Sequence, residues 1–443
     1  MANWKLAKKS KQFIELMRTP SSLFANYFLL QVIVIVIYLG SRERDGYAPP
    51  FSNGMYLGSI ALATLILTIN LLLLSNDSNL DKKDYVYIFS FSFPIIILYL
   101  AMFANHDFGS MQSLTLLFIL IAPLIIWKSN IDKIQIEKIK RMVLYFSITN
   151  TVFAILQILK VIPVAQLNIR EGMSGIGDRP TGILFNAFAM SYASLICFAI
   201  GLNMITNNKN RKNLGWILAI SSGLSLILSG TRTSLWLGFL IFIVTLVSNK
   251  RKMSTIIIKS IPAFLIIIGA GAPIILLFIG MKNGNSDWAT INGRTQMWSC
   301  VESKISDYFP FGIGLDDAFP PQYCAESGWF SNLRHPENMF LLALVESGPI
   351  GFISYVWLFM FTLWVSSKAF LKKFELPLMI TVIFTLSSLI YVPLFHYLPF
   401  LADRPADRGL FNFHFFYLIW IWVLKVNKNS LTNDSQEKIR TKR

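Results

Sequence analysis

Residues 185–248 read FNAFAMSYASLICFAIGLNMITNNKNRKNLGWILAISSGLSLILSGTRTSLWLGFLIFIVTLVS. Three apolar runs follow one another here. A basic connection separates the first two, and the turn Ser229-Gly-Thr-Arg-Thr-Ser234 separates the second from the third. Runs of this length can cross about 30 Å of hydrocarbon, and they must be helical because lipid offers no partner for backbone N–H and C=O groups. The stretch therefore predicts three consecutive transmembrane helices.

The rest of the chain continues this pattern. Of its 443 residues, 54% are hydrophobic and only 14% are charged, and the mean hydropathy is +0.54, whereas soluble chains carry about 25% charged residues. No alternating pattern typical of a membrane barrel is present. We therefore expect an all-α polytopic membrane protein with about twelve transmembrane helices, near residues 22–39, 55–74, 85–104, 113–127, 142–159, 185–204, 214–229, 233–248, 256–281, 345–366, 376–395 and 411–426.

The net charge of +16 has a topological explanation. Of the 40 Lys and Arg residues, 28 fall in alternate connections and in the two tails. Because positive residues are retained in the cytoplasm, this asymmetry places both termini there. The basic N-terminus leads into a full-length apolar span without a small-residue cleavage site, so we expect a permanent anchor in a bacterial inner membrane.

Three outer connections are long: residues 160–184, 282–344 and 396–410. The middle one is rich in aromatic residues, which need burial, and its prolines break it into short pieces. We expect it to form a long, partly helical periplasmic loop over one integral membrane domain, residues 1–443. Residues 428–443 are polar and are expected to form a cytoplasmic tail.

Neither cysteines nor histidines show the spacing of a metal site, so the sequence predicts no metal and no cofactor. Cys197 lies within a span and is expected to serve packing. Cys300 and Cys324 share the long outer loop, where a disulfide and two buried thiols are equally good readings. The four histidines are scattered along the chain.

Several outer arginines lie beside glycine or proline where a span begins. Guanidinium groups match phosphate oxygens in a planar, bidentate way, so arginines converging over a bilayer suggest a lipid pyrophosphate head group. Two alternatives stay open: Arg232 as a snorkelling interfacial residue, and Arg294 as a cation–π partner of Trp298. The candidates are Arg232, Arg294, Arg179 and Arg334, with Arg170, Arg404 and Arg408 as secondary residues.

A further candidate group is Arg334-His-Pro-Glu-Asn338. Pro336 suits the first turn of a helix, so Glu337 and Asn338 are expected in that turn. A single histidine at a membrane interface often has a structural role, but its pairing with Arg334 and Glu337 favours a base. Gly348 and Gly351 then permit a bend and close packing.

Together these motifs resemble the O-antigen ligase and O-antigen polymerase superfamily over roughly residues 175–365. The features that carry the resemblance are Thr231-Arg-Thr233, Gly293-Arg294 with Trp298, Gly312-Ile-Gly314, Arg179-Pro-Thr-Gly182, and His335 with Gly348 and Gly351. The resemblance implies a GT-C-type fold and an inverting, metal-independent glycosyltransferase whose donor is an undecaprenyl-diphosphate-linked glycan.

By the same resemblance, Arg232 and Arg294 would bind the donor diphosphate, helped by Arg179 and Arg334. His335 would take the proton from the acceptor hydroxyl. In this chain Pro336 and Glu337 separate His335 from Asn338, so either His335 or Glu337 is the candidate base.

The acceptor distinguishes two reactions. We favour a polymerase that joins lipid-linked repeat units, with a chain-length regulator as an expected partner. The alternative is a ligase that transfers the glycan to lipid A-core. A lipid-linked oligosaccharide flippase is a reading from another class, but the nearly charge-free spans and the long outer loop disfavour it. Nothing in the sequence indicates nucleic acid.

Overall fold

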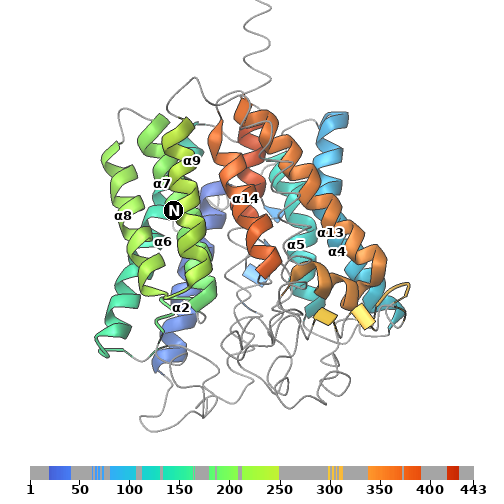
Figure 1. The fold of residues 1–443 in the computed structure, drawn as a ribbon, viewed down its shortest axis with the longest axis horizontal. Coiled ribbons are helices and arrows are strands. Elements are labelled where there is room, and N and C mark those ends of the chain that lie inside the picture. The colour runs from blue at the N-terminus through green and yellow to red at the C-terminus, as the bar shows by residue number, and fades with distance from the viewer. Residues whose placement is uncertain are drawn as a thin grey trace, which may run out of the picture.

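The computed structural model describes residues 19–40, 80–105, 112–129, 133–162, 179–184, 187–207, 212–248, 338–371, 374–390 and 417–428, with isolated residues between 62 and 73 and between 298 and 312, and Val164. These residues form helices, turns and short irregular segments, with no strand among them (Figure 1). The predicted all-α class is confirmed.

The described helices match most of the expected spans. They are α2 (Pro20–Gly40), α4 (Lys82–Ala104), α5 (Gln112–Lys128), α6 (Lys133–Ile158), α7 (Ala187–Asn207), α8 (Lys212–Leu228), α9 (Arg232–Ser248), α13 (Met339–Leu371), α14 (Glu375–Ile390) and a C-terminal helix over residues 417–428.

Length and hydropathy identify the chain as a multi-pass membrane protein. Four helical segments are long and apolar enough to cross a bilayer: Lys82–Ala104, Ile134–Ile158, Ala189–Thr206 and Met339–Leu371. Large apolar side chains such as Trp236 and Ile227 are 72% and 63% exposed, as expected of surfaces that face lipid. The expected spans at 55–74 and 256–281 lie largely or wholly outside the described residues, so the total of twelve stays a prediction.

Two helices are longer than predicted. α6 begins at Lys133 rather than near residue 142, and α13 covers Met339–Leu371 rather than residues 345–366. Hydropathy marks only the part of a helix that contacts hydrocarbon. The first turns of α6 are instead stabilised outside it, for example by the i,i+3 ion pair of Lys140 with Glu137 at 3.2 Å.

Because successive helices alternate in direction, their ends form two sets. The end that the charge count predicts to face away from the cytoplasm, named the outer end below, holds Asn105, Gln157, Thr181, Gly230 and Asn338. The basic end, which the charge count predicts to be cytoplasmic, holds Asp81, Trp127, Lys140, Glu375 and Lys428.

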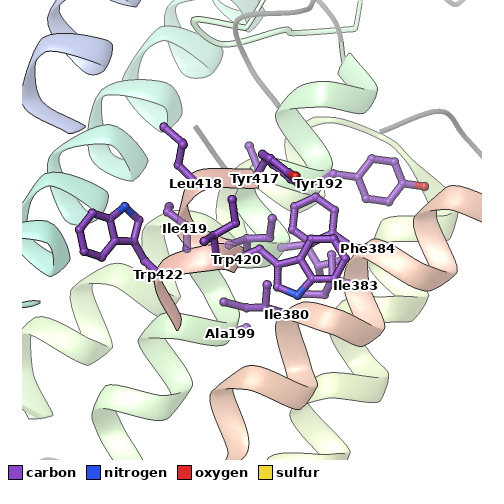
Figure 2. Packing of buried hydrophobic residues seen from close by; sticks show 14 of the residues in the cluster. Tyr192, Ala199, Ile380, Ile383, Phe384, Tyr417, Leu418, Ile419, Trp420 and Trp422 are labelled. Carbon is purple, nitrogen blue, oxygen red and sulfur yellow. The ribbon is translucent and has the colours of Figure 1, made fainter. Parts of the chain in front are cut away.

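The C-terminal helix lies in the core. Trp420 is fully buried and stacks on Phe384 of α14, with ring centroids 4.6 Å apart and planes at 11°. Its Nε1 donates to Oγ1 of Thr381 at 2.9 Å. Figure 2 shows this helix between side chains of α7 and α14, including Tyr192 and Ile380. The last described helix is thus central to the packing.

Small residues bring α7 and α8 together. A Cβ atom at Gly201 would lie 2.8 Å from the backbone N of Ala219, and one at Gly215 would lie 3.0 Å from the N of Ile205. Both helices therefore touch through their backbones, a contact that larger side chains would prevent. Cys197 is buried in the same core and is free, as expected of a packing residue.

At the basic end, two lysines tie the C-terminal helix to its neighbours. Lys428 Nζ lies 3.0 Å from Oδ2 of Asp81 and also forms an ion pair with Asp84. Asp81 and Asp84 together form the capping box of α4. Lys425 Nζ donates to the carbonyls of Ile126 and Trp127 at 2.8 and 2.6 Å. Since a helix leaves its last carbonyls without partners, this ammonium caps the C-terminal end of α5.

Candidate functional site

A turn at residues 181–184 is held at the outer end by a buried amide. Oε1 of Gln157 accepts from the backbone N–H groups of Thr181 and Gly182, both at 2.9 Å. Its Nε2 donates to the carbonyl of Gly182 at 3.1 Å. Oδ1 of Asn150 accepts from the N–H of Ile183 at 3.1 Å. Two side chains of α6 thus fix the position of the chain directly after Arg179.

Gly182 is required by this arrangement. Its φ is +58°, and a Cβ atom there would collide with the carboxamide of Asn150 and lie 3.0 Å from the carbonyl oxygen of the same residue. Only glycine adopts this backbone conformation without strain and leaves room for the amide.

The α8–α9 turn lies next to this segment. It is tightened by the N–H of Gly230 donating to the carbonyl of Ile227 at 3.1 Å and by Oγ of Ser229 donating to Leu226 at 2.7 Å. A Cβ atom at Gly230 would lie 3.8 Å from Nε of Arg179. Arg179 is half-buried, and its guanidinium therefore lies against the turn that precedes α9, whose first residue is Arg232.

Thr231 contributes a hydroxyl group to the α8–α9 turn beside Arg179. It is 3% exposed, and in the described part of the chain its Oγ1 has no hydrogen-bond partner. It immediately precedes α9, whose first N–H groups and helix dipole favour an anion. A guanidinium, a helix N-terminus and a buried hydroxyl together can bind a phosphate.

Asn338 caps the start of α13. Its Oδ1 accepts from the N–H groups of Phe340 and Leu341 at 3.0 and 3.2 Å, and the residue is 2% exposed. The expectation that Asn338 lies in the first helical turn is wrong, whereas Glu337 lies outside the described residues. The helix begins at Met339, because the asparagine side chain satisfies the first N–H groups from outside the helix.

The expected bend in α13 is confirmed. Gly348 has φ +68° and ψ −169°, which breaks the helix into two parts, and Figure 1 shows the bend. A short piece of the long outer loop packs against the first part: a Cβ atom at Gly312 would lie 2.6 Å from the carbonyl oxygen of Glu346. Nδ2 of Asn105 donates to the carbonyl of Gly312 at 3.4 Å.

The described residues thus bring Arg179 to the turn that carries Arg232. The remaining candidates lie outside them: Arg170, Arg294, Arg334, His335, Glu337, Arg404 and Arg408, together with the side chain of Arg232, Cys300, Cys324 and all four histidines. Trp298 is buried at 4% exposure. Among the described residues, no group of three His, Cys, Asp or Glu side chains could hold a metal ion.

The roles of Asn150 and Gln157 are not predicted from the sequence. Each is a carboxamide within a predicted span, 33 and 24 residues from its main partner in the sequence, so no local motif reveals the contact. The available signal was their polarity, because a polar side chain inside a span needs a partner and often marks a functional region.

No curated protein matches the chain. Residues 217–356 match the model of the family described as O-antigen ligase. The matched segment includes the α8–α9 turn and the whole of the first part of α13. Members of this family transfer glycosyl groups. The chain is therefore a multi-pass membrane protein that is similar to the O-antigen ligase family over residues 217–356.

Proposed function

We propose that this protein polymerises undecaprenyl-diphosphate-linked oligosaccharide repeat units at the periplasmic face of a bacterial inner membrane. The observation that supports this is the contact of Arg179 with the α8–α9 turn, 3.8 Å from the Cβ position of Gly230. This contact places the guanidinium of Arg179 beside the N-terminus of α9 at Arg232. That N-terminus lies inside the region that matches the family.

In this proposal the outer end binds the donor diphosphate. Arg179, the N–H groups at the start of α9 and the hydroxyl of Thr231 hold the phosphate oxygens, joined by Arg232, Arg294 and Arg334. The bond between the anomeric carbon and the phosphate oxygen breaks, and the departing undecaprenyl diphosphate keeps the electron pair. Fixed cations stabilise that charge as it develops, without a metal ion.

His335 or Glu337 takes the proton from the acceptor hydroxyl, and the freed oxygen attacks the anomeric carbon from the face opposite the leaving group. The configuration at that carbon is therefore inverted. Asn338, the residue directly after Glu337, helps to position this group by capping the start of α13. The surrounding bundle would be of the GT-C type.

The first test replaces Arg179 by Ala and by Lys. We expect both variants to insert normally and to lose polymer, by about 100-fold or more for Ala, since one lost charge-stabilising donor costs this much. Lysine cannot restore a bidentate grip. Arg141→Lys, an exposed change at the basic end, is the control. If the Arg179 variants gave an unchanged polymer ladder on a gel, Arg179 would be excluded from the donor site.

The second test concerns the base. His335→Ala or Glu337→Gln should remove most transfer activity of purified protein given a lipid-linked donor, while His106→Ala and His414→Ala should leave it near the wild-type rate. Equal losses across all four variants would contradict a role for either candidate. Transfer by purified protein would also exclude a flippase.

A ligase is the second candidate, because the matched region carries the description O-antigen ligase. A deletion strain distinguishes the two. One repeat unit on the lipid A-core indicates a lost polymerase. A bare core with polymer retained on the lipid carrier indicates a lost ligase.

A further inference from the structure

A second place for a small amphiphilic ligand lies at the opposite end of the bundle from Thr181 and Gly230. There α6, α7, α14 and the C-terminal helix enclose a cavity of about 410 Å³. Its walls come from the ends of these helices that carry Lys140, Asn203, Glu375 and Asn427. It is therefore at the basic end and forms no part of the candidate glycan site.

The cavity wall changes character with depth. On each helix an apolar lining residue lies farther from the basic end than a polar one does: Val143 than Lys140, Ile200 than Asn203, and Ile419 than Asn427. A ligand that fits this order has a polar head at the helix ends and an apolar chain that points into the bundle. A lipid from the adjacent leaflet enters in this orientation.

Two buried polar atoms on the C-terminal helix require partners. Trp422 and Asn427 are 3% and 4% exposed, and both line the cavity. Nε1 of Trp422 and Oδ1 of Asn427 have no hydrogen-bond partner among the residues that the structure describes. Native structures rarely leave such atoms unpaired. One atom is a donor and the other an acceptor, so the ligand must accept near Trp422 and donate near Asn427.

The depth of these two atoms agrees with a phospholipid. The two residues are five positions apart in the helix, which is about 7.5 Å of helical rise, and Asn427 is nearer the helix end. A phospholipid has its head group on the outside and its ester carbonyls further in. An ester carbonyl would accept from Trp422, and a donor on the head group would reach Asn427.

Charge at the opening favours a zwitterionic head. Nζ of Lys140 lies 3.2 Å from Oε1 of Glu137, and an ammonium with three N–H donors can bind a phosphate as well. The carboxylate of Glu375 lines the same cavity. One cation and one carboxylate complement a head group that carries both a phosphate and an ammonium.

We propose that this cavity binds phosphatidylethanolamine. Lys140 donates to the lipid phosphate, the lipid ammonium donates to Oδ1 of Asn427 and to Glu375, and Nε1 of Trp422 donates to an ester carbonyl. One acyl chain lies against Val143, Ile200 and Ile419.

Native mass spectrometry of delipidated full-length protein tests this proposal. Phosphatidylethanolamine, phosphatidylcholine and phosphatidylglycerol with identical acyl chains are titrated separately. Phosphatidylcholine is the matched ligand, because its quaternary ammonium has no N–H to donate. We expect phosphatidylethanolamine to bind about tenfold more tightly, the effect of one hydrogen bond to a charged group.

Variants assign the contacts. Asn427→Leu should abolish the preference for phosphatidylethanolamine, and Asn427→Asp, which keeps an acceptor, should retain it. Lys140→Met should weaken both zwitterionic lipids, while Lys138→Met, an exposed change on the same helix, should weaken neither. Filling the cavity by Val423→Phe should weaken all three lipids.

Three results would overturn the proposal. Equal affinity for phosphatidylethanolamine and phosphatidylcholine would exclude recognition of the ammonium. Tighter binding of phosphatidylglycerol would make the ligand an anionic lipid. Binding of none of the lipids would make the cavity a solvent-filled space.

Discussion

At the scale of single residues, Gly182 gives the sharpest prediction for stability. An alanine there would have φ near +58° and a Cβ atom in collision with Asn150. We expect Gly182→Ala to lower the free energy of unfolding by about 2–4 kcal/mol, from backbone strain and overpacking together. Thermal unfolding of the purified protein measures this.

Gly223→Ala is the control for Gly182→Ala. Gly223 lies in α8, and the nearest atom to its Cβ position is a ring carbon of Phe198 at 3.8 Å. Alanine is also the better helix former, so this variant should be as stable as the wild type or slightly more stable. Equal destabilisation by both changes would contradict the described turn.

Gln157 is the second residue with a measurable role. Gln157→Leu leaves the buried N–H groups of Thr181 and Gly182 without their acceptor. We expect a loss of about 3 kcal/mol in unfolding free energy and a loss of glycan transfer, because Arg179 would no longer be held in place. Gln135→Leu, the same change near the other end of α6, should retain transfer activity.

These two residues also show the limit of sequence reasoning at this scale. Arg179 and Gly182 can be recognised because both belong to one short motif, residues 179–182. Asn150 and Gln157, which hold that motif in place, were missed because they come from a different helix. Patterns within a segment predict which residues need support, and only the packing of helices reveals which residues supply it.

At the scale of elements, α13 connects the candidate base to the bundle. Asn338→Ala removes the cap from the N–H groups of Phe340 and Leu341 and should cost about 1 kcal/mol. Asn338→Asp keeps the acceptor and adds a negative charge at the helix N-terminus, so it should be at least as stable. Chemical denaturation of both variants checks this; equal losses would contradict the capping role.

The extent of helices could be predicted in part. The centres of the described spans agree with the apolar runs, because hydrocarbon requires those runs. The nine extra residues at the start of α6 and the six at the start of α13 could not be predicted from hydropathy. In both places local polar contacts, an ion pair and a cap, continue the helix beyond the apolar part.

At the scale of the whole molecule, Lys428 joins the C-terminal helix to α4. Its side chain is 14% exposed and that of Asp84 is 11% exposed. Lys428→Met should destabilise the protein by about 3 kcal/mol, because a nearly buried carboxylate loses its ammonium partner. Asp84→Asn in the same chain should recover part of the loss. Additive losses in this double-mutant cycle would contradict the coupling.

The ion pair of Lys428 with Asp81 predicts that the stability of the protein depends on pH. Desolvation raises the pKa of Asp81, but hydrogen bonds from Lys428 and from the backbone of Asp84 outweigh it and hold the pKa below its ordinary value of 3.8. A lowered folded pKa stabilises the protein above the unfolded pKa, and this contribution is lost as pH falls through the folded pKa. The stability difference between wild type and Lys428→Met should therefore narrow below about pH 4, as measured by unfolding at several pH values.

The close contact of α7 and α8 at Gly201 and Gly215 has a consequence for membrane insertion. Helices whose backbones touch, and which are joined by only residues 208–211, can leave the translocon together as one hairpin. Neither glycine then has to find its partner later by diffusion in the bilayer. Bulky replacements at these positions should therefore lower the yield of membrane-inserted protein, rather than the activity of the protein that does insert.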